Sequence, residues 1–216
     1  MPNPDFDERA ATWDDEPERR ERAHEVARKV LATGQLASSS RVLDYGAGTG
    51  LLSEGLVGHV GALLLADPSA GMREVAQQKV AADVLPGARV LDLDLTQDPV
   101  PDLEVDAIVT MMALHHIPDL TPVLAAFAAL LPVGGTLAIV DLEEEDGSFH
   151  DEDFDGHHGF NRTQLTAALT MAGFDPPRFE HAFRVPKEDR TYDLFLAVAH
   201  RSSNTGARAC DSPGSG

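Results

Sequence analysis

Three glycines at alternate positions form the part of this sequence best suited to approach a ligand. They belong to the run Asp44-Tyr45-Gly46-Ala47-Gly48-Thr49-Gly50. Glycine allows a sharp turn and a close approach of the backbone, and a helix that follows such a turn presents free N–H groups. A dinucleotide-binding fingerprint would place its third glycine at position 51, where this chain has Leu51. The spacing predicts a ligand held by the backbone and argues against a dinucleotide.

Acidic residues end the next two apolar segments. Asp67 follows the segment 62–66, and the segment 89–93 runs into Asp92-Leu93-Asp94-Leu95. A carboxylate at the first of these places would accept hydrogen bonds from a ribose diol. One at the second would accept from an adenine amino group. We favour Asp94 over Asp92 there because strand alternation leaves Asp94 farther beyond the sheet edge, whereas Asp92 fits a solvated acid.

The elements that must position these residues alternate between strand and helix. Strands are predicted at 41–45, 62–66, 89–93, 105–110 and 136–140, followed by closing strands at about 178–185 and 192–199 around the turn 186–189. Helices are predicted at 17–33, with Asp15 as its cap, at about 70–80 and 120–131, and between the caplike Asn161 and Gly173. This order predicts a doubly wound α/β domain with a terminal antiparallel hairpin. Its parallel strands end at one edge, where ligands bind.

Together these features resemble the class I S-adenosylmethionine-dependent methyltransferases. The resemblance covers about residues 1–200 and rests on segments 6–14, 42–50, 65–72, 94–95, 114–116 and 131–135. Among the subgroups, the chain is most similar to small-molecule enzymes related to the methyltransferases of quinone biosynthesis. The resemblance implies a three-layer, Rossmann-like fold. It further implies a seven-stranded, mostly parallel sheet, a C-terminal antiparallel hairpin and an N-terminal helical cap.

The resemblance also implies which residues bind S-adenosylmethionine, whose product is S-adenosylhomocysteine. These are Asp44, Tyr45, Gly46, Ala47, Gly48, Gly50, Asp67, Pro68, Met72, Asp94, Leu95 and Met111. The glycine run would contact the methionine and ribose portions, with Asp44 near the ammonium group and Asp67 on the ribose hydroxyls. Residues 68, 72, 94 and 95 would surround the adenine, and Met111 would face the sulfonium end. Tyr45 and Val133 depart from the usual pattern, in which an aliphatic residue and a basic residue are common.

Composition favours one globular domain. The chain has 216 residues, 43% of them apolar and 25% charged, which suffices for one buried core. We expect a cap segment and helix at 1–36, the S-adenosylmethionine-binding domain at 37–200 and a disordered tail at 201–216. The sequence shows no apolar run of roughly 20 residues, no secretory signal and a single cysteine, Cys210. A cytoplasmic protein without a membrane segment is therefore expected.

The charge balance bears on the methyl acceptor. A net charge of −19 repels nucleic-acid phosphates and anionic lipid headgroups. We therefore expect a small-molecule acceptor and neither nucleic acid nor a membrane as partner. A monomer and a homodimer both fit the sequence.

Methyl transfer needs a general base only when the acceptor loses a proton. The candidates are His115, His116, His150, His157, His158 and Tyr192. We choose His116, with a structural role for one or both rings of the His115-His116 pair as the main alternative. The polar insert 143–159 has potential metal ligands, but their spacing matches no defined site, so we expect no metal. The insert is interpreted as a solvated loop or as a lid, and Trp13 as a cover for the site or an anchor for the leading helix.

Two other functions stay open at this point. A non-catalytic, regulatory protein that binds S-adenosylmethionine would share the same signature. A nicotinamide-dependent dehydrogenase is the other common use of such sheets, although the glycine spacing argues against it.

Overall fold

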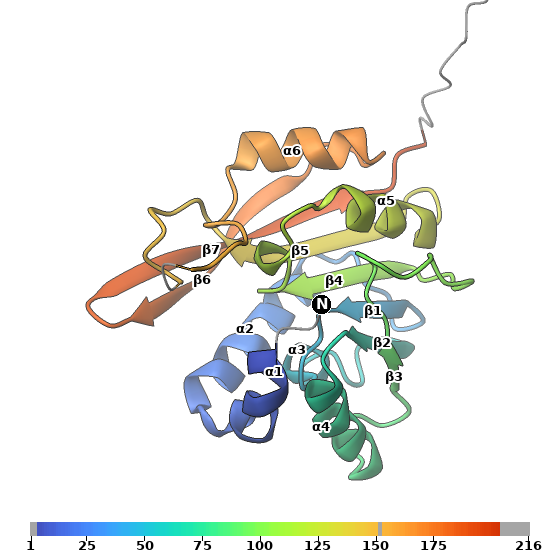
Figure 1. Cartoon of the computed structure of the whole chain (residues 1–216). Coiled ribbons are helices and arrows are strands. Elements are labelled where there is room, and N and C mark those ends of the chain that lie inside the picture. Colours follow the sequence, from blue (N-terminus) through green and yellow to red (C-terminus); the bar gives the residue numbers. More distant parts are fainter. Residues whose placement is uncertain (1–3, 151–152, 204–216) are drawn as a thin grey trace, which may run out of the picture.

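A computed structural model describes residues 4–150 and 153–203 of the chain. Its centre is one sheet of seven strands in the order β3-β2-β1-β4-β5-β7-β6 (Figure 1). The strands are β1 (Arg41–Tyr45), β2 (Ala62–Asp67), β3 (Arg89–Asp92), β4 (Ala107–Met111), β5 (Thr136–Leu142), β6 (Arg178–Lys187) and β7 (Arg190–His200). The first five are mutually parallel, and β7 runs antiparallel to β5 and β6. The predicted fold class is confirmed.

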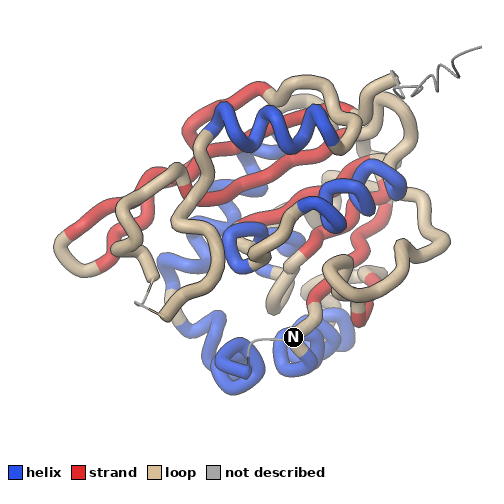
Figure 2. The backbone as a smooth tube through the Cα atoms, turned by 45° about the horizontal axis from the view of Figure 1, so that its top comes forward, coloured by secondary structure: helices blue, strands red, loops and turns tan. Residues whose placement is uncertain are grey.

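Helices cover both faces of this sheet, as the backbone trace in Figure 2 shows. They are α1 (Pro4–Arg9), the 3-10 helix η1 (Ala10–Asp15), α2 (Pro17–Ala32), α3 (Leu51–Glu54), α4 (Ala70–Ala81), the 3-10 helix η2 (Leu114–His116), α5 (Thr121–Leu130) and α6 (Arg162–Met171). Helices α2, α3 and α4 pack against one face, and α5 and α6 pack against the other. The result is three layers with an apolar core on each side of the sheet.

Strand alternation in β1 divides its side chains between these two cores. Leu43 and Tyr45 face the α5 side, whereas Val42 faces the α2 side. β1 lies between β2 and β4. After β1 the chain forms β2 and β3 on one side of it, and the later strands, beginning with β4, on the other side. The carboxyl ends of β1 and β4 therefore form the switch point at which such sheets bind ligands.

Local differences from the sequence prediction occur mainly at element ends. The cap of α2 is Glu16 rather than the predicted Asp15, and no side chain caps its first turn, because η1 continues through Asp15. Asn161 does cap α6, accepting hydrogen bonds from the N–H groups of Thr163 and Gln164. The hairpin strands β6 and β7 extend to a turn of two residues, Glu188 and Asp189, so they are longer than predicted.

The C-terminal end of the fold also extends beyond the predicted boundary. Arg201, which the sequence assigns to a disordered tail, pairs with Phe174 in an isolated β-bridge and donates from Nε to the carbonyl of Ala128 at 2.9 Å. Residues 204–216, including Cys210, lie outside the described residues. Within the described part of the chain, no helix combines the length and apolar character needed to cross a bilayer.

Candidate functional site

The glycine turn after β1 adopts a backbone that other residues rarely reach. Gly46, Gly48 and Gly50 have φ angles of +70°, +57° and +86°. A Cβ atom at position 46 would lie 2.4 Å from Cβ of Ala113, in the segment that follows β4. The N–H groups of Gly46 and Ala47 both donate to the carbonyl of Ala66, at 2.8 and 3.1 Å. The turn is thus fastened to the end of β2 and closely approached by the segment after β4.

Asp67 ends β2 and connects two elements of the site. Its Oδ2 accepts from the N–H of Gly48 at 2.7 Å, and its Oδ1 accepts from the N–H of Ser69 at 2.9 Å. Burial raises the pKa of Asp67, and the two backbone hydrogen bonds oppose that rise. Each carboxylate oxygen keeps acceptor capacity after one hydrogen bond, which fits the predicted role toward a ribose diol.

Asp44 lies beneath the turn in a closed environment. Its side chain is 1% exposed, and its Oδ2 accepts from the hydroxyl of Ser53 at 2.7 Å. Burial raises the pKa of Asp44 to about 7; the Ser53 hydrogen bond opposes the rise and the neighbouring Asp67 adds to it. A cation bound next to this carboxyl would favour its ionised form. The buried carboxyl of Asp44 therefore fits the ammonium group expected there.

The unusual Tyr45 points to the other face of the sheet. Its ring packs edge-on against Phe127 of α5, with centroids 5.1 Å apart, and its hydroxyl accepts from the N–H of Leu95 at 3.1 Å. Burial raises the pKa of this hydroxyl. Tyr45 thus links β1 to the segment after β3, and its predicted contact with the cofactor stays a prediction.

The structure separates the two acids that follow β3. Asp92 is exposed and forms an ion pair with Arg73 at 2.8 Å, as expected for a solvated acid. Asp94 is half-buried; its Oδ1 accepts from the N–H and hydroxyl of Thr96, and its Oδ2 accepts from Nε2 of Gln97. Burial alone would raise the pKa of Asp94, but these hydrogen bonds lower it overall. Asp94 is therefore held as an oriented carboxylate.

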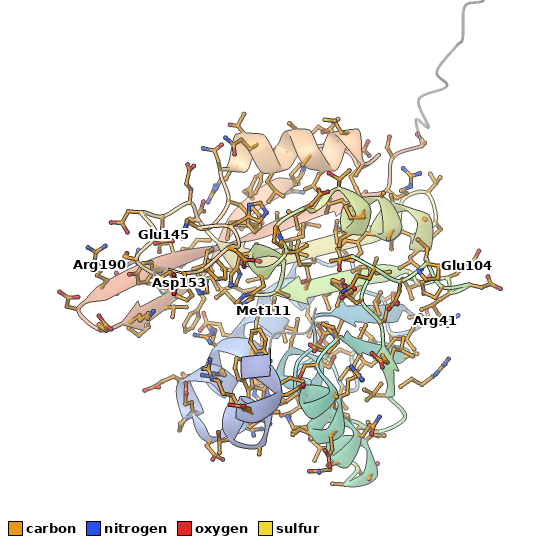
Figure 3. The ribbon with its side chains drawn as sticks, viewed as in Figure 1. Arg41, Glu104, Met111, Glu145, Asp153 and Arg190 are labelled. Atoms are coloured by element: carbon orange, nitrogen blue, oxygen red, sulfur yellow. The ribbon has the colours of Figure 1, made fainter. Side chains whose placement is uncertain are left out.

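Two methionines and Pro68 border the turn. Met72 is 2% exposed, and its sulfur lies 3.8 Å from the place that a Cβ at Gly48 would take. Pro68 is half-buried at the start of α4. Met111 ends β4, at the sheet edge toward the insert and away from the edge that carries Arg41 (Figure 3). The predicted contacts of these three residues with the cofactor stay predictions.

A histidine–aspartate pair joins the ends of β4 and β5. His115 Nδ1 lies 2.6 Å from Oδ1 of Asp141, and each of the two side chains is 1% exposed. Asp141 Oδ2 also accepts from the N–H groups of Leu114 and His115. Sequence reasoning missed Asp141, although an acid at the end of an apolar strand was a usable signal.

His116, the predicted base, lies among aromatic rings. Its ring centroid is 5.2 Å from that of Phe6, 4.1 Å from His115 and 5.5 Å from Phe154. Burial, followed by the neighbouring His115 and His150, lowers the pKa of His116 to about 3. The imidazole is therefore neutral at pH 7 and can accept a proton, but it is a weaker base than a solvated histidine. Its catalytic role stays a prediction.

The insert 143–159 packs against this histidine pair from outside the sheet. The N–H of His157 donates to the carbonyl of His115 at 2.7 Å, and Phe154 stacks on His150 with centroids 3.7 Å apart. Tyr192, also a candidate base, instead bonds the hydroxyl of Ser148 at 2.8 Å. Within 4–150 and 153–203, no three His, Cys, Asp or Glu side chains form a group able to hold a metal.

Sequence reasoning also missed the polar contacts of the N-terminal segment. Asp7 accepts from the hydroxyl of Ser69 at 2.5 Å, and Asp14 accepts from the hydroxyl of Thr49 at 2.6 Å. Trp13 lies under the guanidinium of Arg19, 3.9 Å from it, so here it anchors the start of α2. The two hydrogen-bonded pairs are separated by 62 and 35 residues in the sequence, so they left no local signal.

A groove of about 440 Å³ lies apart from the glycine turn, between the start of the insert and the hairpin. Residues of both charges line it, among them Glu143, Arg162, Arg184 and Asp193. Most of these charges pair with each other, as in Arg162–Glu143 and Arg184–Asp193. The groove therefore adds no reactive group to the site described above.

Comparison with known proteins adds independent information. The family model described as a methyltransferase domain matches residues 18–177. An uncharacterised methyltransferase of Oceanobacillus iheyensis is 33% identical over 99 residues, covering 46% of this chain and 44% of its own. The ubiquinone/menaquinone biosynthesis C-methyltransferase UbiE of Xanthomonas campestris is 28% identical over 134 residues, covering 60% and 53%. The chain spans about half the length of the curated relatives it matches.

A solved structure supports the fold. The SAM-dependent methyltransferase from Aquifex aeolicus superposes with a TM-score of 0.67 and 22% identity, covering 90% of this chain and 98% of that one. At this identity the likeness concerns the fold alone. The family match covers well over half of the chain, and the glycine turn with its two acids lies inside it. The chain therefore belongs to the methyltransferase-domain family, within the class I S-adenosylmethionine-dependent methyltransferases.

Proposed function

We propose that this protein transfers a methyl group from S-adenosylmethionine to a small-molecule acceptor by in-line displacement. The observation that carries the proposal is the hydrogen bond between Asp67 and the N–H of Gly48, with Asp44 buried beneath the same turn. At the carboxyl ends of β1 and β2, this arrangement places three features together: a carboxylate that can accept from a ribose diol, a glycine backbone that a ligand can approach closely, and a buried carboxyl that can pair with a cation. Family membership supports the same cofactor.

The cofactor, when bound, supplies a methyl group on an electrophilic sulfonium. An electron pair of the acceptor would form the new bond to the methyl carbon, and the sulfur would leave with the electrons of the broken bond as the neutral thioether of S-adenosylhomocysteine. The chain's task is mainly to orient the two partners, which is worth up to roughly 7–11 kcal/mol in well-aligned systems. Asp67, Asp44 and Asp94 are assigned to hold the ribose, the ammonium group and the adenine amino group.

An acceptor that carries a proton must also lose it. His116 is assigned to take that proton, because its neutral ring lies in η2, shortly after the carboxyl end of β4. His115 is the alternative: Asp141 accepts a proton donated by Nδ1, which leaves Nε2 as the acceptor nitrogen. The pH–rate profiles of the variants His116→Gln and His115→Gln would distinguish the two assignments. The rate of an enzyme with a general base falls at low pH, where the base is protonated, and only the variant that lacks the base should lose this fall.

Two observations support a small acceptor. The net charge of −19 disfavours polyanions, and the relative from Xanthomonas campestris is named for a biosynthetic C-methylation of quinones. Whether carbon, nitrogen, oxygen or sulfur is methylated in this protein is left to experiment.

Calorimetric titration with S-adenosylmethionine and S-adenosylhomocysteine tests the proposal first. We expect saturable binding of both, and no binding would contradict the assignment. Transfer of a labelled methyl group to a panel of small hydroxyl, amine, thiol and carbon acceptors is the second test. Binding without any transfer would favour a non-catalytic role, and tight binding of NAD in place of S-adenosylmethionine would favour a dehydrogenase.

A further inference from the structure

Arg73 is the fourth residue of α4, and its side chain reaches back past the start of that helix. Its Nη1 donates to the carbonyl oxygen of Asp67 at 2.9 Å, and its Nη2 lies 2.8 Å from Oδ2 of Asp92. Asp67 and Asp92 are register partners at the ends of the parallel strands β2 and β3. The Arg73 side chain is only 15% exposed. One largely buried guanidinium therefore spans the carboxyl ends of both strands.

The position of this cation runs against the local preference of a helix. Free N–H groups give the start of a helix a partial positive charge, so basic side chains are favoured at its other end. The first turn of α4 has no acidic residue that would offset this charge. Natural proteins break such local rules mainly at functional sites, where another part of the structure compensates. For Arg73, the compensation comes from acids outside its own helix.

Ionisable groups from four elements act on the carboxyl of Asp67 or on its cation. They are Asp7 of α1, Asp44 and Tyr45 of β1, Arg73 of α4 and Asp92 of β3. Arg73 is the basic member of this group. Burial raises the pKa of Asp67, the N–H groups of Ser69 and Gly48 oppose that rise, and the charge of Arg73 opposes it further.

The charge state of Asp67 decides how it can serve a ribose. An ionised carboxylate accepts hydrogen bonds with both oxygens, whereas a protonated carboxyl presents a donor on one of them. Each oxygen already accepts from one backbone N–H, of Gly48 or Ser69. A ribose diol therefore needs the remaining acceptor capacity of the ionised form, which a nearby positive charge favours.

We propose that Arg73 is a positioning residue of the cofactor site, which keeps Asp67 ionised and in place to accept from the ribose diol. The inference rests on the proposed function, since the ribose is that of S-adenosylmethionine. Arg73 acts through Asp67 and not on the reacting atoms. Its hydrogen bond to the Asp67 carbonyl holds the end of β2, and its charge acts on the Asp67 carboxyl.

Calorimetric titration with S-adenosylhomocysteine tests the inference in a double-mutant cycle of Arg73→Gln and Asp67→Asn. Arg73→Gln should bind about 10-fold more weakly than wild type at pH 6, because more of its Asp67 is protonated there. The ratio should shrink toward pH 8.5, where Asp67 is ionised in both proteins. Asp44 titrates in both proteins, so its own effect cancels in the ratio.

The second half of the cycle separates charge from backbone support. In the Asp67→Asn background, where residue 67 cannot ionise, Arg73→Gln should change the affinity less than about twofold. If Arg73 only supported the backbone of β2, its loss would weaken binding equally in both backgrounds and at both pH values. That result would overturn the inference.

Two further variants serve as controls. Asp92→Asn removes the ion pair between Arg73 and β3 but keeps the cation, so its affinity should stay within about twofold of wild type. A loss equal to that of Arg73→Gln would show that Arg73 works by joining two strands, and the inference would be wrong. Arg162→Gln is the matched control, since Arg162 begins α6 and pairs with Glu143 after β5. It should bind with wild-type affinity.

Arg73→Lys keeps the inference testable if Arg73→Gln does not fold. Lysine retains the charge but lacks the planar fork that reaches two acceptors at once. Its affinity at pH 6 should stay within about threefold of wild type, whereas a loss of about 10-fold or more would contradict the inference. If wild-type protein binds no S-adenosylhomocysteine, the proposed function itself fails.

Discussion

At the residue scale, Asp67 does two things at once. Its oxygens hold the N–H groups of Gly48 and Ser69, and they face the place assigned to the ribose. Asp67→Ala would leave those donors unpaired and remove the diol acceptor. We expect affinity for S-adenosylhomocysteine to fall by at least ~1 kcal/mol, or more than about fivefold, in a calorimetric titration.

Loss of stability must be separated from loss of binding in this variant. Asn161→Ala is a suitable control, since it removes the cap of α6 and should cost ~1 kcal/mol of unfolding free energy. Helix α6 contributes no residue to the assigned cofactor site, so its variant should bind with wild-type affinity. An Asp67→Ala protein that also keeps that affinity would refute the ribose assignment.

Asp44 makes a prediction about pH. Burial raises the pKa of Asp44 to about 7, whereas an unfolded aspartate ionises near pH 3.9. Between these values the folded chain binds more protons than the unfolded chain, so Asp44 lowers the free energy of unfolding as the pH rises from about 4 to 7. A bound ammonium group favours the ionised carboxyl. Affinity for S-adenosylhomocysteine should therefore increase as the pH rises from 6 to 8.

The variant Asp44→Asn removes the titrating group and keeps nearly the same shape. Calorimetry at several pH values should show weaker binding and a flatter pH dependence than in the wild-type protein. A wild-type affinity that stays constant from pH 6 to 8 would contradict the pairing of Asp44 with the ammonium group.

At the scale of elements, the insert 143–159 determines the environment of His116. A Cβ at Gly156 would lie 2.2 Å from the carbonyl oxygen of His115, so the insert backbone sits directly on η2. Phe154 contacts the rings of both His116 and His150. The insert therefore acts as a cover over the histidine pair and not only as a solvated loop.

Shortening Phe154 should rehydrate His116. In Phe154→Ala, the pKa of His116 is expected to rise from about 3 toward its ordinary value of 6.5, because burial is the main cause of its depression. Titration of the histidine ring protons by NMR measures this change. The exposed His181, on the hairpin, serves as the internal control for the fold, and its ring-proton chemical shifts at one fixed pH should match those of the wild-type protein. If the pKa of His116 stayed unchanged, residues other than Phe154 would be the ones that exclude water from its ring.

The elements themselves were largely predictable, because strand and helix periodicity are local properties of a sequence. β1 has its predicted bounds, and α4 ends within one residue of its prediction. The two short helices before α2 were not predictable, since this segment carries little apolar periodicity. Within residues 6–15, the side chains of Asp7 and Asp14 contact Ser69, Thr49 and Lys79, which lie far away in the sequence. The Asp14–Lys79 pair spans 65 positions, and only the fold brings its members together.

At the scale of the whole molecule, the site depends on the order of the strands. The glycine turn follows β1, Asp67 ends β2 and Asp94 follows β3, and these three strands are neighbours. On the other side, Met111 ends β4 and Asp141 is the last residue but one of β5. Motif spacing predicts the first group because each acid ends its own strand. The pairing of His115 with Asp141 requires β4 and β5 to be adjacent, which spacing alone does not show.

The whole molecule also carries far more acidic than basic side chains, 36 against 17, and this imbalance has a measurable consequence. At neutral pH the chain has a net charge of −19, and its acidic groups repel one another most strongly in the compact folded state. Salt screens that repulsion, since the Debye length falls from about 10 Å at 0.1 M to about 3 Å at 1 M. The same screening weakens ion pairs, but exposed pairs contribute little, and the half-buried pairs of Lys79 with Asp14 and Glu54 are screened least. We therefore expect the melting temperature at pH 7.5 to rise between 0.1 and 1 M sodium chloride.

Near the isoelectric point of about 4.6, where the net charge vanishes, the same salt should change the melting temperature much less. A melting temperature that falls with salt at pH 7.5 would show that attractive pairs outweigh the net repulsion.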